Sequence, residues 1–400
     1  MEIYLVGGAV RDKRLGLPVG ERDWVVVGAT PQDLLSQGFR PVGKDFPVFL
    51  HPATKEEYAL ARTERKTGPG YTGFATCHDP TITLEQDLRR RDLTINAMAE
   101  TPAGELIDPY SGADDLDNGV LRHVSPAFAE DPVRILRVAR FAARFARWGF
   151  RVAHETNALM RQMIDSGEVD HLVPERVWAE FARALGEQTP QRFFDVLHAC
   201  GALVRLFPEV APLYPPARPA RHGQENGAFF ALPAAVALSA DPSIRCAALV
   251  CDIDRATGAS FDTQRLAAMC ARLRAPTAYR ELSALALRQR GRVHAAGTLP
   301  APDLLDLLDA LDAFRRPERF EDLLRVCRAD ARLPDEADAY PPAALLRAAR
   351  GVAAAVEVAD LVADGADGEV IARRLRERRI LAIQEMGADT TQDPASGAAL

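Results

Sequence analysis

The feature that most limits how this chain can fold is the point, near residue 130, at which its strand signals stop. Before it, the β-branched runs 3–6 (IYLV) and 23–27 (DWVVV) each end at a glycine, and residues 47–51 and 57–61 have the pattern of a hairpin. After it, apolar residues recur at helical spacing as far as about residue 385. The clearest helices are expected at 131–148, 174–185 and 190–206, and Thr30-Pro31 is expected to cap a short helix within the head that runs through Leu35. The sequence therefore predicts an α+β head on an all-helical body.

The length of 400 residues is too great for one ordinary core, so we expect several packed units. We place the head at residues 1–145, a first helical part at 146–211 and a second at 212–386. A proline-rich linker is expected where the second helical part begins, after residue 211. Residues 387–400 are small and polar, and we expect them to be disordered. The Gly/Thr-rich stretch 66–74 is expected to be a mobile loop within the head.

Composition sets the class of protein but not its function. No apolar run reaches the roughly 18–20 residues that span a bilayer, and the N-terminus has no export pattern, so we expect a cytoplasmic protein. Six cysteines without CxxC spacing are expected to be buried thiols in a reducing compartment. The formal net charge of −7 argues against a protein that coats nucleic acid nonspecifically, although it permits a local basic groove.

The first chemical motif is LVGGAVRD, at residues 5–12 between an expected strand and an expected helix. Its two glycines let backbone N–H groups approach a phosphate, and Arg11 can pair with the same anion. The structural alternative is a tight turn that needs glycine for its dihedral angles. Taken alone, the motif leaves both interpretations open.

The second motif is Glu21-Arg22-Asp23. In a strand the side chains of Glu21 and Asp23 would point to the same side, where two carboxylates repel unless a cation lies between them. Hard oxygen ligands of this kind suit Mg²⁺, which can also hold substrate phosphates. An isolated acidic pair is more often a solvated strand edge, but its position shortly after the glycine turn favours a metal site.

Two arginine-rich motifs follow. In RRRDLTINA, which begins at Arg89, three arginines are a candidate triphosphate clamp, although a charged helix start on the surface is a common alternative. In EDPVR, Asp131 opens a helix that carries an arginine stripe, which would suit a polyphosphate or an RNA backbone. An aspartate before a proline is also an ordinary helix cap.

Taken in this order, the motifs resemble those of the class II tRNA nucleotidyltransferases, the CCA-adding enzymes of the DNA polymerase β superfamily. The series is strand-GG-x-V-R-D, carboxylate-x-Asp, RRD-x-T-x-N-A and E-D-x-x-R-x-x-R. The resemblance runs from residue 1 to about 210 and includes HLVPERVWAEF at 171–181, and it is closest to the proteobacterial branch. It implies a polymerase β-like nucleotidyltransferase head followed by a helical neck, body and tail. It also implies two-metal transfer of nucleotides from CTP and ATP to tRNA, with no membrane and no stable protein partner.

The resemblance also implies roles for individual residues. Gly8 and Arg11 would hold the nucleotide, and Glu21 and Asp23 would carry Mg²⁺, with Glu57 as a possible third carboxylate. The triphosphate would be gripped by Arg91, Arg137 and Arg140. Asp131 and Arg134 would read the incoming base.

That base-reading role has a physical basis. A carboxylate accepts a hydrogen bond from the exocyclic amine that cytosine and adenine share, whereas uracil and guanine present a carbonyl at the same edge. A carboxylate left facing a carbonyl costs about 1–3 kcal/mol or more. One Asp–Arg pair can therefore admit CTP and ATP and reject UTP and GTP.

The chain departs from the family pattern in two places. Glu21 stands where an aspartate is usual, and its extra methylene shifts the carboxylate, which Mg²⁺ tolerates poorly; we expect a working but slower enzyme. Related proteobacterial enzymes carry a His-Asp phosphohydrolase region, but here Cys251 precedes Asp252 and only His222 and His294 remain in this half of the chain. We therefore expect no phosphohydrolase activity and a scaffold that binds RNA, with RRLRERR at 373–379 as a phosphate contact.

Three alternatives remain. Bacterial poly(A) polymerases share these motifs, although they tend to be more basic. A non-catalytic tRNA-binding relative, disabled at Glu21, would have no need of the base-reading pair. A phosphate-binding metabolic enzyme would leave the arginine helix unexplained.

Overall fold

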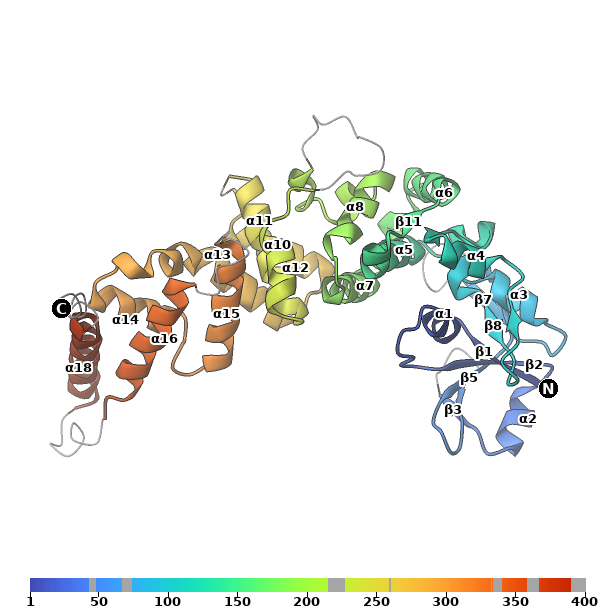
Figure 1. Ribbon diagram of the computed structural model, residues 1–400, viewed down its shortest axis with the longest axis horizontal. Coiled ribbons are helices and arrows are strands. Elements are labelled where there is room, and N and C mark those ends of the chain that lie inside the picture. Colours follow the sequence, from blue (N-terminus) through green and yellow to red (C-terminus); the bar gives the residue numbers. More distant parts are fainter. Residues whose placement is uncertain are drawn as a thin grey trace, which may run out of the picture. The chain divides into compact units, whose positions relative to one another are not determined.

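The fold is described from a computed structural model of the chain, which divides into two compact units, Met1–Gly227 and Ala228–Leu400 (Figure 1). Each unit is described by itself. The described residues are 1–42, 48–66, 74–214, 227–258, 260–331, 333, 340–357 and 367–389. Among them no helix is long and apolar enough to cross a membrane.

A mixed sheet lies in the first unit, with strand order β3-β4-β5-β2-β1-β8-β9. The central strands β1 (Glu2–Val6) and β2 (Asp23–Val27) are antiparallel, and β2 runs parallel to β5 (Glu57–Leu60). The outer strands are β3 (Arg40–Val42), β4 (Val48–Leu50), β8 (Ala99–Glu100) and β9 (Leu106–Ile107). Both predicted strands and the predicted hairpin, which is β4–β5, are confirmed.

Both faces of this sheet bury apolar side chains. Val25 and Val26 are adjacent on β2 but belong to different core clusters, because successive strand residues point to opposite faces. The Val26 cluster includes Leu34 of α2 (Pro31–Ser36), a helix that Thr30 caps as the Thr-Pro pattern predicts. Since Val25 and Val26 are each only 1% exposed, β2 is held firmly near its first residue, Asp23.

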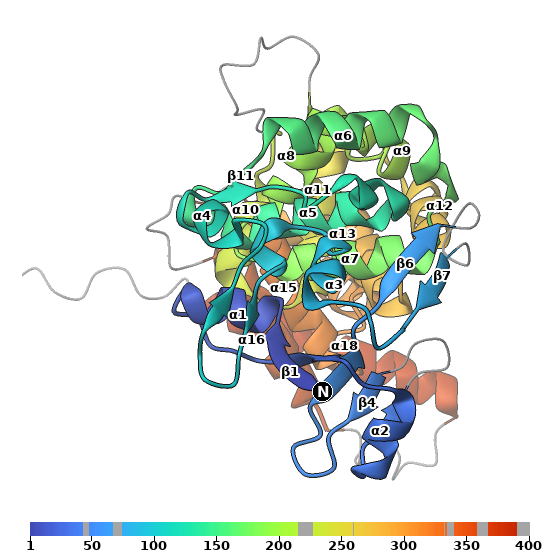
Figure 2. The ribbon, with the colours of Figure 1, turned by 90° about the vertical axis from the view of Figure 1, so that its right-hand side faces the viewer.

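Strands β6 (Thr63–Lys66) and β7 (Phe74–Cys77) form a separate antiparallel hairpin (Figure 2). The expectation of a loop at 66–74 is therefore wrong for the two residues at its ends, and 67–73 lie outside the described residues. Its glycines and threonines are typical of a turn but do not show that strands flank it.

Helices make up most of the rest of the first unit. They are α1 (Gly8–Arg14), α3 (Leu84–Arg89), α4 (Gly112–Asp117), α5 (Val133–Phe145), α6 (His154–Asp165), α7 (Pro174–Gly186), α8 (Gln191–Cys200) and α9 (Leu203–Leu206). The single helix expected at 190–206 is wrong, because the chain turns at Gly201, whose φ is 87°. The short strands β10 (Val120–Leu121) and β11 (Arg151–Val152) pair in parallel.

Among the described residues of the second unit, all the regular elements are helices, as the periodicity predicts. Its helices are α10 (Ala231–Leu238), α11 (Pro242–Ala256), α12 (Thr263–Leu273), α13 (Thr277–His294), α14 (Ala301–Ala310), α15 (Pro317–Asp330), α16 (Pro341–Ala354) and α18 (Gly368–Asp389). Five cysteines are buried, but Cys77 on β7 is exposed, so the expectation of buried thiols is wrong for that residue. The expectation of disorder at 387–400 falls mostly on residues outside the described ones.

Candidate nucleotide site

The glycine turn joins β1 to α1 and lies against an arginine. Gly7 has φ of +71°, which favours glycine, and a Cβ there would lie 2.9 Å from Nη1 of Arg91. At Gly8 a Cβ would lie 3.4 Å from Nη2 of Arg11. The motif therefore serves two purposes, since it makes the turn and leaves room for a guanidinium over the backbone.

The carboxylates meet at the start of β2. Asp23 is the first residue of this strand, opposite Glu57 in the parallel register with β5 and opposite Val6 on β1. Because paired residues in a sheet point to the same face, Asp23 and Glu57 share one side. Glu21 precedes the strand, so the expectation that Glu21 and Asp23 alternate within one strand is wrong; Glu21 is exposed and less constrained by the sheet.

Asp23 is itself exposed, but charged and uncharged protein groups lie close to its carboxyl group. Desolvation by the surrounding protein raises the pKa of its carboxyl group, Arg91 opposes this shift, and the nearby Glu21 carboxylate adds to it. Two carboxylates close enough to raise a pKa are stabilised by a cation, and Mg²⁺ commonly binds one or two carboxylates together with substrate phosphates. The residues present therefore fit a divalent cation.

Arg91 stands beside these carboxylates with donor capacity left. Its Nη2 donates to Oδ2 of Asp87 at 3.2 Å, whereas its buried Nε has no hydrogen-bond partner. Asp87 is completely buried and also pairs with Arg90 at 2.8 Å. Burial opposes ionisation, but the two arginines outweigh it and lower the pKa of the Asp87 carboxyl group. Because Nε is enclosed by protein, a phosphate oxygen would bind the Nη groups of Arg91.

The arginine stripe of α5 is held by buried carboxylates. Arg137 donates from Nε to Oδ2 of Asp92 at 2.6 Å, and Arg140 donates from Nε to Oε2 of Glu180, on α7, at 2.6 Å. Burial opposes ionisation of Asp92, yet Arg137 and Asn96 lower the pKa of its carboxyl group well below the ordinary value. Each guanidinium is therefore fixed in place and is left with other donors for an anion.

Asp131 precedes α5 and forms a bidentate ion pair with Arg176 on α7. The distances are 3.1 Å from Nη1 to Oδ1 and 2.8 Å from Nη2 to Oδ2. The backbone N–H of Val133 donates to Oδ1 as well, at 3.1 Å. Since each carboxylate oxygen can accept two hydrogen bonds, Oδ2 keeps room for one more donor.

Arg134 and Arg11 are deeper than the sequence suggests. Arg134 is 8% exposed and donates to the carbonyl oxygens of Ala127 and Arg90, at 2.9 and 2.6 Å. Arg11 is 3% exposed, donates to Asp12 and Asn96, and lies over the ring of Phe141. Burial lowers the pKa of the Arg11 guanidinium. In this structure both arginines support the protein around the site.

Together these residues form one network of hydrogen bonds and ion pairs, in which Arg137 and Glu180 are joined by an ion pair at 3.9 Å, and sequence reasoning missed it. It runs Arg144–Asp12–Arg11–Asn96–Asp92–Arg137–Glu180–Arg140 and joins α1, the turn at 92–96, α5 and α7. Asp92 and Asn96 lie within the RRDLTINA motif, but the motif assigns no role to either of them. Nothing in the sequence around Glu180 indicates that it pairs with Arg140.

The second unit holds a charge cluster where the family resemblance places a hydrolase site. Asp252 accepts hydrogen bonds from the backbone N–H groups of Phe230, Ala231 and Leu232, so it caps α10. Arg290 pairs with both Asp254 and Asp330, while His294 donates from Nε2 to the carboxylate of Asp330 at 3.0 Å. Within the described part of the chain, no three His, Cys, Asp or Glu side chains are grouped so that they could hold a metal ion.

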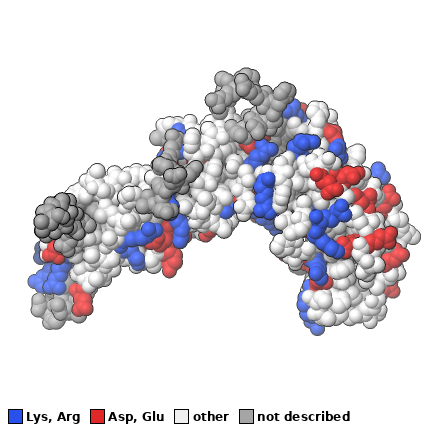
Figure 3. All heavy atoms as spheres, in the orientation of Figure 1, with Lys and Arg blue, Asp and Glu red and all other residues white. Residues whose placement is uncertain are grey.

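Acidic and basic side chains also lie close together on the surface of the first unit, at the right of Figure 3. The arrangement in this unit, a carboxylate pair beside paired arginines, suits a cation–polyphosphate ligand.

Two family models match the first unit. Residues 3–122 match the poly A polymerase head domain, and residues 149–214 match the probable RNA and SrmB-binding site of polymerase A. The chain is also similar over nearly its full length to proteins called multifunctional CCA protein. That of Nitrosococcus oceani is 54% identical, covering 96% of this chain and 98% of the relative; that of Thioalkalivibrio sulfidiphilus is 53% identical, covering 97% and 99%.

Solved structures with a similar fold include the Bacillus stearothermophilus CCA-adding enzyme in complex with CTP. It has a TM-score of 0.61 and 23% identity, covering 97% of this chain and 94% of that chain. The Thermotoga maritima CCA-adding enzyme complexed with tRNA has a TM-score of 0.61 and 19% identity, covering 97% and 91%. At these identities the similarity concerns the fold alone.

Proposed function

The chain belongs to the multifunctional CCA protein family, and from this premise we propose that it adds and repairs the 3′-terminal CCA of tRNA. It is a CCA tRNA nucleotidyltransferase that uses CTP and ATP without a nucleic-acid template and releases diphosphate. Its substrates place it in the cytoplasm. The single observation that carries the proposal is the pair of carboxylates at the start of β2, Glu21 before the strand and Asp23 on it, near Arg91 and within a head that matches the family model.

Nucleotidyltransferases of this kind depend in general on a divalent metal ion, and we propose Mg²⁺, held by Glu21 and Asp23 with Glu57 beside them. The ion would supply charge neutralisation and activation of the attacking 3′-hydroxyl. Arg91, Arg137 and Arg140 grip the triphosphate, because each is fixed by a carboxylate and has further donors to offer. Gly8 leaves space for the nucleotide, while Arg11 supports the turn from below.

Asp131 selects the base. The acceptor position left on its Oδ2 suits one amine hydrogen of cytosine or adenine, and a carbonyl of uracil or guanine would be repelled there. Arg134 is bound to two backbone carbonyls, so it reaches a base only by exchanging one of these hydrogen bonds. We propose that nucleotide binding drives this exchange.

The second unit is not a phosphohydrolase in this proposal, whatever activities its relatives' name covers. Cys251 is fully buried, and burial raises the pKa of its thiol to about 12, so it does not supply a thiolate ligand. The unit instead serves as a helical scaffold for RNA. In α18, Arg376 already pairs with Asp306 and Arg379 donates to the carbonyl of Ala353, and we propose the exposed Arg378 as one phosphate contact of this segment.

Extension of a tRNA that lacks its 3′ CCA tests the proposal. The purified protein is given Mg²⁺ and labelled CTP and ATP, singly and together. Two C and one A, followed by a halt, is the expected result. Open-ended addition of A would indicate a poly(A) polymerase, and binding without extension would indicate a relative disabled at Glu21. Metal-stimulated opening of a 2′,3′-cyclic nucleotide to the nucleoside 2′- or 3′-monophosphate would contradict the absence of hydrolase activity.

A further inference from the structure

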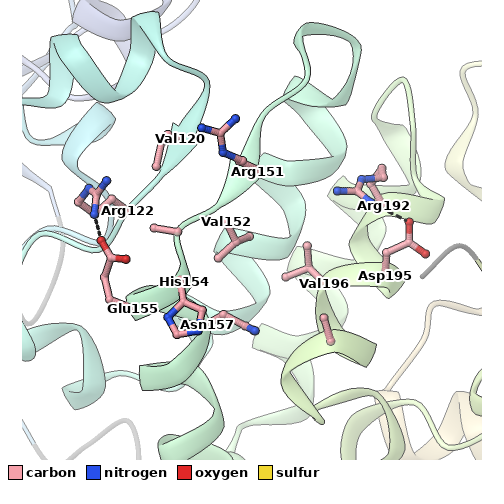
Figure 4. A pocket seen from close by; sticks show the side chains of 12 residues that line it. Val120, Arg122, Arg151, Val152, His154, Glu155, Asn157, Arg192, Asp195 and Val196 are labelled. Carbon is pink, nitrogen blue, oxygen red and sulfur yellow. Dashed lines mark hydrogen bonds and ion pairs between the residues drawn. The ribbon is translucent and has the colours of Figure 1, made fainter. Parts of the chain in front are cut away.

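A pocket of about 580 Å³ lies in the first unit, and none of its lining residues belongs to the nucleotide site described above (Figure 4). The β10–β11 pairing brings residues 120–122 beside the start of α6, and α8 closes the other side. Val120, Val152 and Val196 contribute apolar surface to it. Its volume falls within the roughly 300–1,000 Å³ that is typical of small-molecule sites.

Three arginines surround this apolar surface. Arg122 pairs with Glu155 on one side and Arg192 pairs with Asp195 at 3.2 Å on the other, as Figure 4 shows. Both carboxylates of the pocket are thus already bound to a guanidinium. The third arginine, Arg151, is exposed and has no hydrogen bond or ion pair from its side chain to any described residue. Arg122 also pairs with Asp115 at 3.0 Å, so Arg151 is the arginine of the pocket that has no carboxylate partner among the described residues.

This combination limits the chemistry of a ligand. Inorganic phosphate alone would leave the valine surface uncovered, and a purely apolar ligand would leave Arg151 without a counter-charge. A flat ring attached to a phosphate satisfies both, because bases stack on apolar side chains and guanidinium planes, while a guanidinium binds phosphate oxygens. Asn157, which also lines the pocket, can donate to or accept from a base edge.

We propose that this pocket binds one nucleotide, with its ring on the valine surface and its phosphate on Arg151. The proposal rests on the proposed function, since RNA is then the natural source of the nucleotide. All the lining residues except Val120 and Arg122 fall within 149–214, the part of the chain that matches the RNA-binding family model. A free nucleoside monophosphate has the same chemistry and is the other source.

The test measures binding to the full-length protein, not catalysis. Fluorescence anisotropy gives the Kd for labelled tRNA lacking CCA at several salt concentrations, and equilibrium dialysis gives the Kd for labelled AMP and CMP. Arg151→Gln removes the charge, and Val152→Trp fills the pocket. Arg40→Gln on the edge strand β3 is the matched control, because it removes an equally exposed arginine from the same unit. Thermal melting checks that each variant is folded.

We expect Arg151→Gln to weaken tRNA binding about tenfold and to lower the salt slope by about one phosphate contact, whereas Arg40→Gln changes neither. Val152→Trp should weaken binding without altering the slope. If only AMP or CMP binding falls in both pocket variants, the pocket takes a free nucleotide. If the folded variants bind tRNA, AMP and CMP like the wild type, the proposal is overturned. CCA addition by the wild type, measured separately, shows whether the proposed function stands independently.

Discussion

At the residue scale, the arginines of the nucleotide site are held by carboxylates rather than free in solvent. Asp87 holds Arg91, Asp92 holds Arg137 and Glu180 holds Arg140. A buried carboxylate that keeps its charge fixes the guanidinium and leaves part of its donor fork for a ligand. In the proposed site, these three acids therefore position the arginines that we propose grip the triphosphate.

Glu21 gives the first prediction. Glu21→Asp shortens the side chain to the length usual in the family, so we expect kcat to rise by about tenfold at fixed Mg²⁺, through better ion geometry. Asp23→Asn removes a ligand and should lower kcat by roughly 100-fold or more. Single-turnover extension of tRNA at several Mg²⁺ concentrations measures both.

Glu2→Gln is the matched control, because Glu2 is an exposed carboxylate at the opposite end of β1 and hydrogen-bonds only locally with Tyr4. It should leave kcat unchanged. If Glu21→Asp is no faster than the wild type at any Mg²⁺ concentration, the geometry of Glu21 does not limit the rate.

Asp92 gives a prediction about pH. Its pKa is lowered in the folded protein, so below the ordinary value near 3.9 the unfolded chain binds a proton that the folded protein does not. The stability that Asp92 contributes is therefore present above about pH 4 and is lost as pH falls. Asp92→Asn should cost about 1–3 kcal/mol at neutral pH and make the loss between about pH 4 and pH 2 less steep.

Urea unfolding at a series of pH values measures this slope. Asp114→Asn, an exposed site on α4, is the control and should keep the wild-type slope. If the pH dependence of stability is the same in Asp92→Asn as in the wild type, then Arg137 does not lower the pKa of Asp92.

At the scale of elements, regular periodicity was predictable and short pairings were not. The β-branched runs predict β1 and β2, and the capping pattern predicts α2, because these signals are local. Strands β10 and β11 have two residues each and depend on a partner some 30 positions away, which no local pattern reports. Strands β6 and β7 are neighbours in the sequence, but the glycines and threonines between them indicate only a turn and not the strands on either side.

Gly112 opens α4 and gives a prediction at this scale. A Cβ on Gly112 would lie 2.2 Å from the carbonyl oxygen of Thr94 and 2.9 Å from Cγ of Met98. Gly112→Ala must therefore push α4 away from the turn at 94–96, at a cost of about 1–3 kcal/mol. Denaturant unfolding measures the loss. Gly20→Ala in the same unit meets nothing within 4 Å and should cost far less. Equal stability of the two variants would contradict the close contact.

At the scale of the whole molecule, the two units are stabilised differently. We expect a chelator to leave the thermal unfolding of the second unit unchanged, because Arg290 and His294 occupy the acidic groups that a metal would need. Asp252→Ala should destabilise this unit by about 2–4 kcal/mol, since three N–H groups at the start of α10 lose their acceptor.

Differential scanning calorimetry with and without EDTA measures both effects. Asp303→Ala, an exposed aspartate on α14, is the control and should shift the transition little. A lower melting temperature of the wild type in EDTA would reveal a structural metal and contradict the first expectation.

The sequence could predict the α+β head, the helical body and the motifs of the nucleotide site, because each depends on spacing or residue type. It could not predict that Arg11 and Arg134 are buried and bound to protein groups, because exposure depends on how α1 and α5 pack. Nor could it show that Glu21 lies before β2, since a strand begins where its neighbours begin to pair.

The network of hydrogen bonds and ion pairs from Arg144 to Arg140 has a consequence for how such a chain evolves. Each internal residue of the network contacts two others. Replacing a charged one therefore leaves the opposite charge of a neighbour unpaired, and only a second replacement can remove that charge. Effects of paired substitutions should then be strongly non-additive. Across related chains these positions would be inherited as a block: a lineage that loses Asp92 should have lost or exchanged Arg137 with it, while the exposed sites around them drift independently.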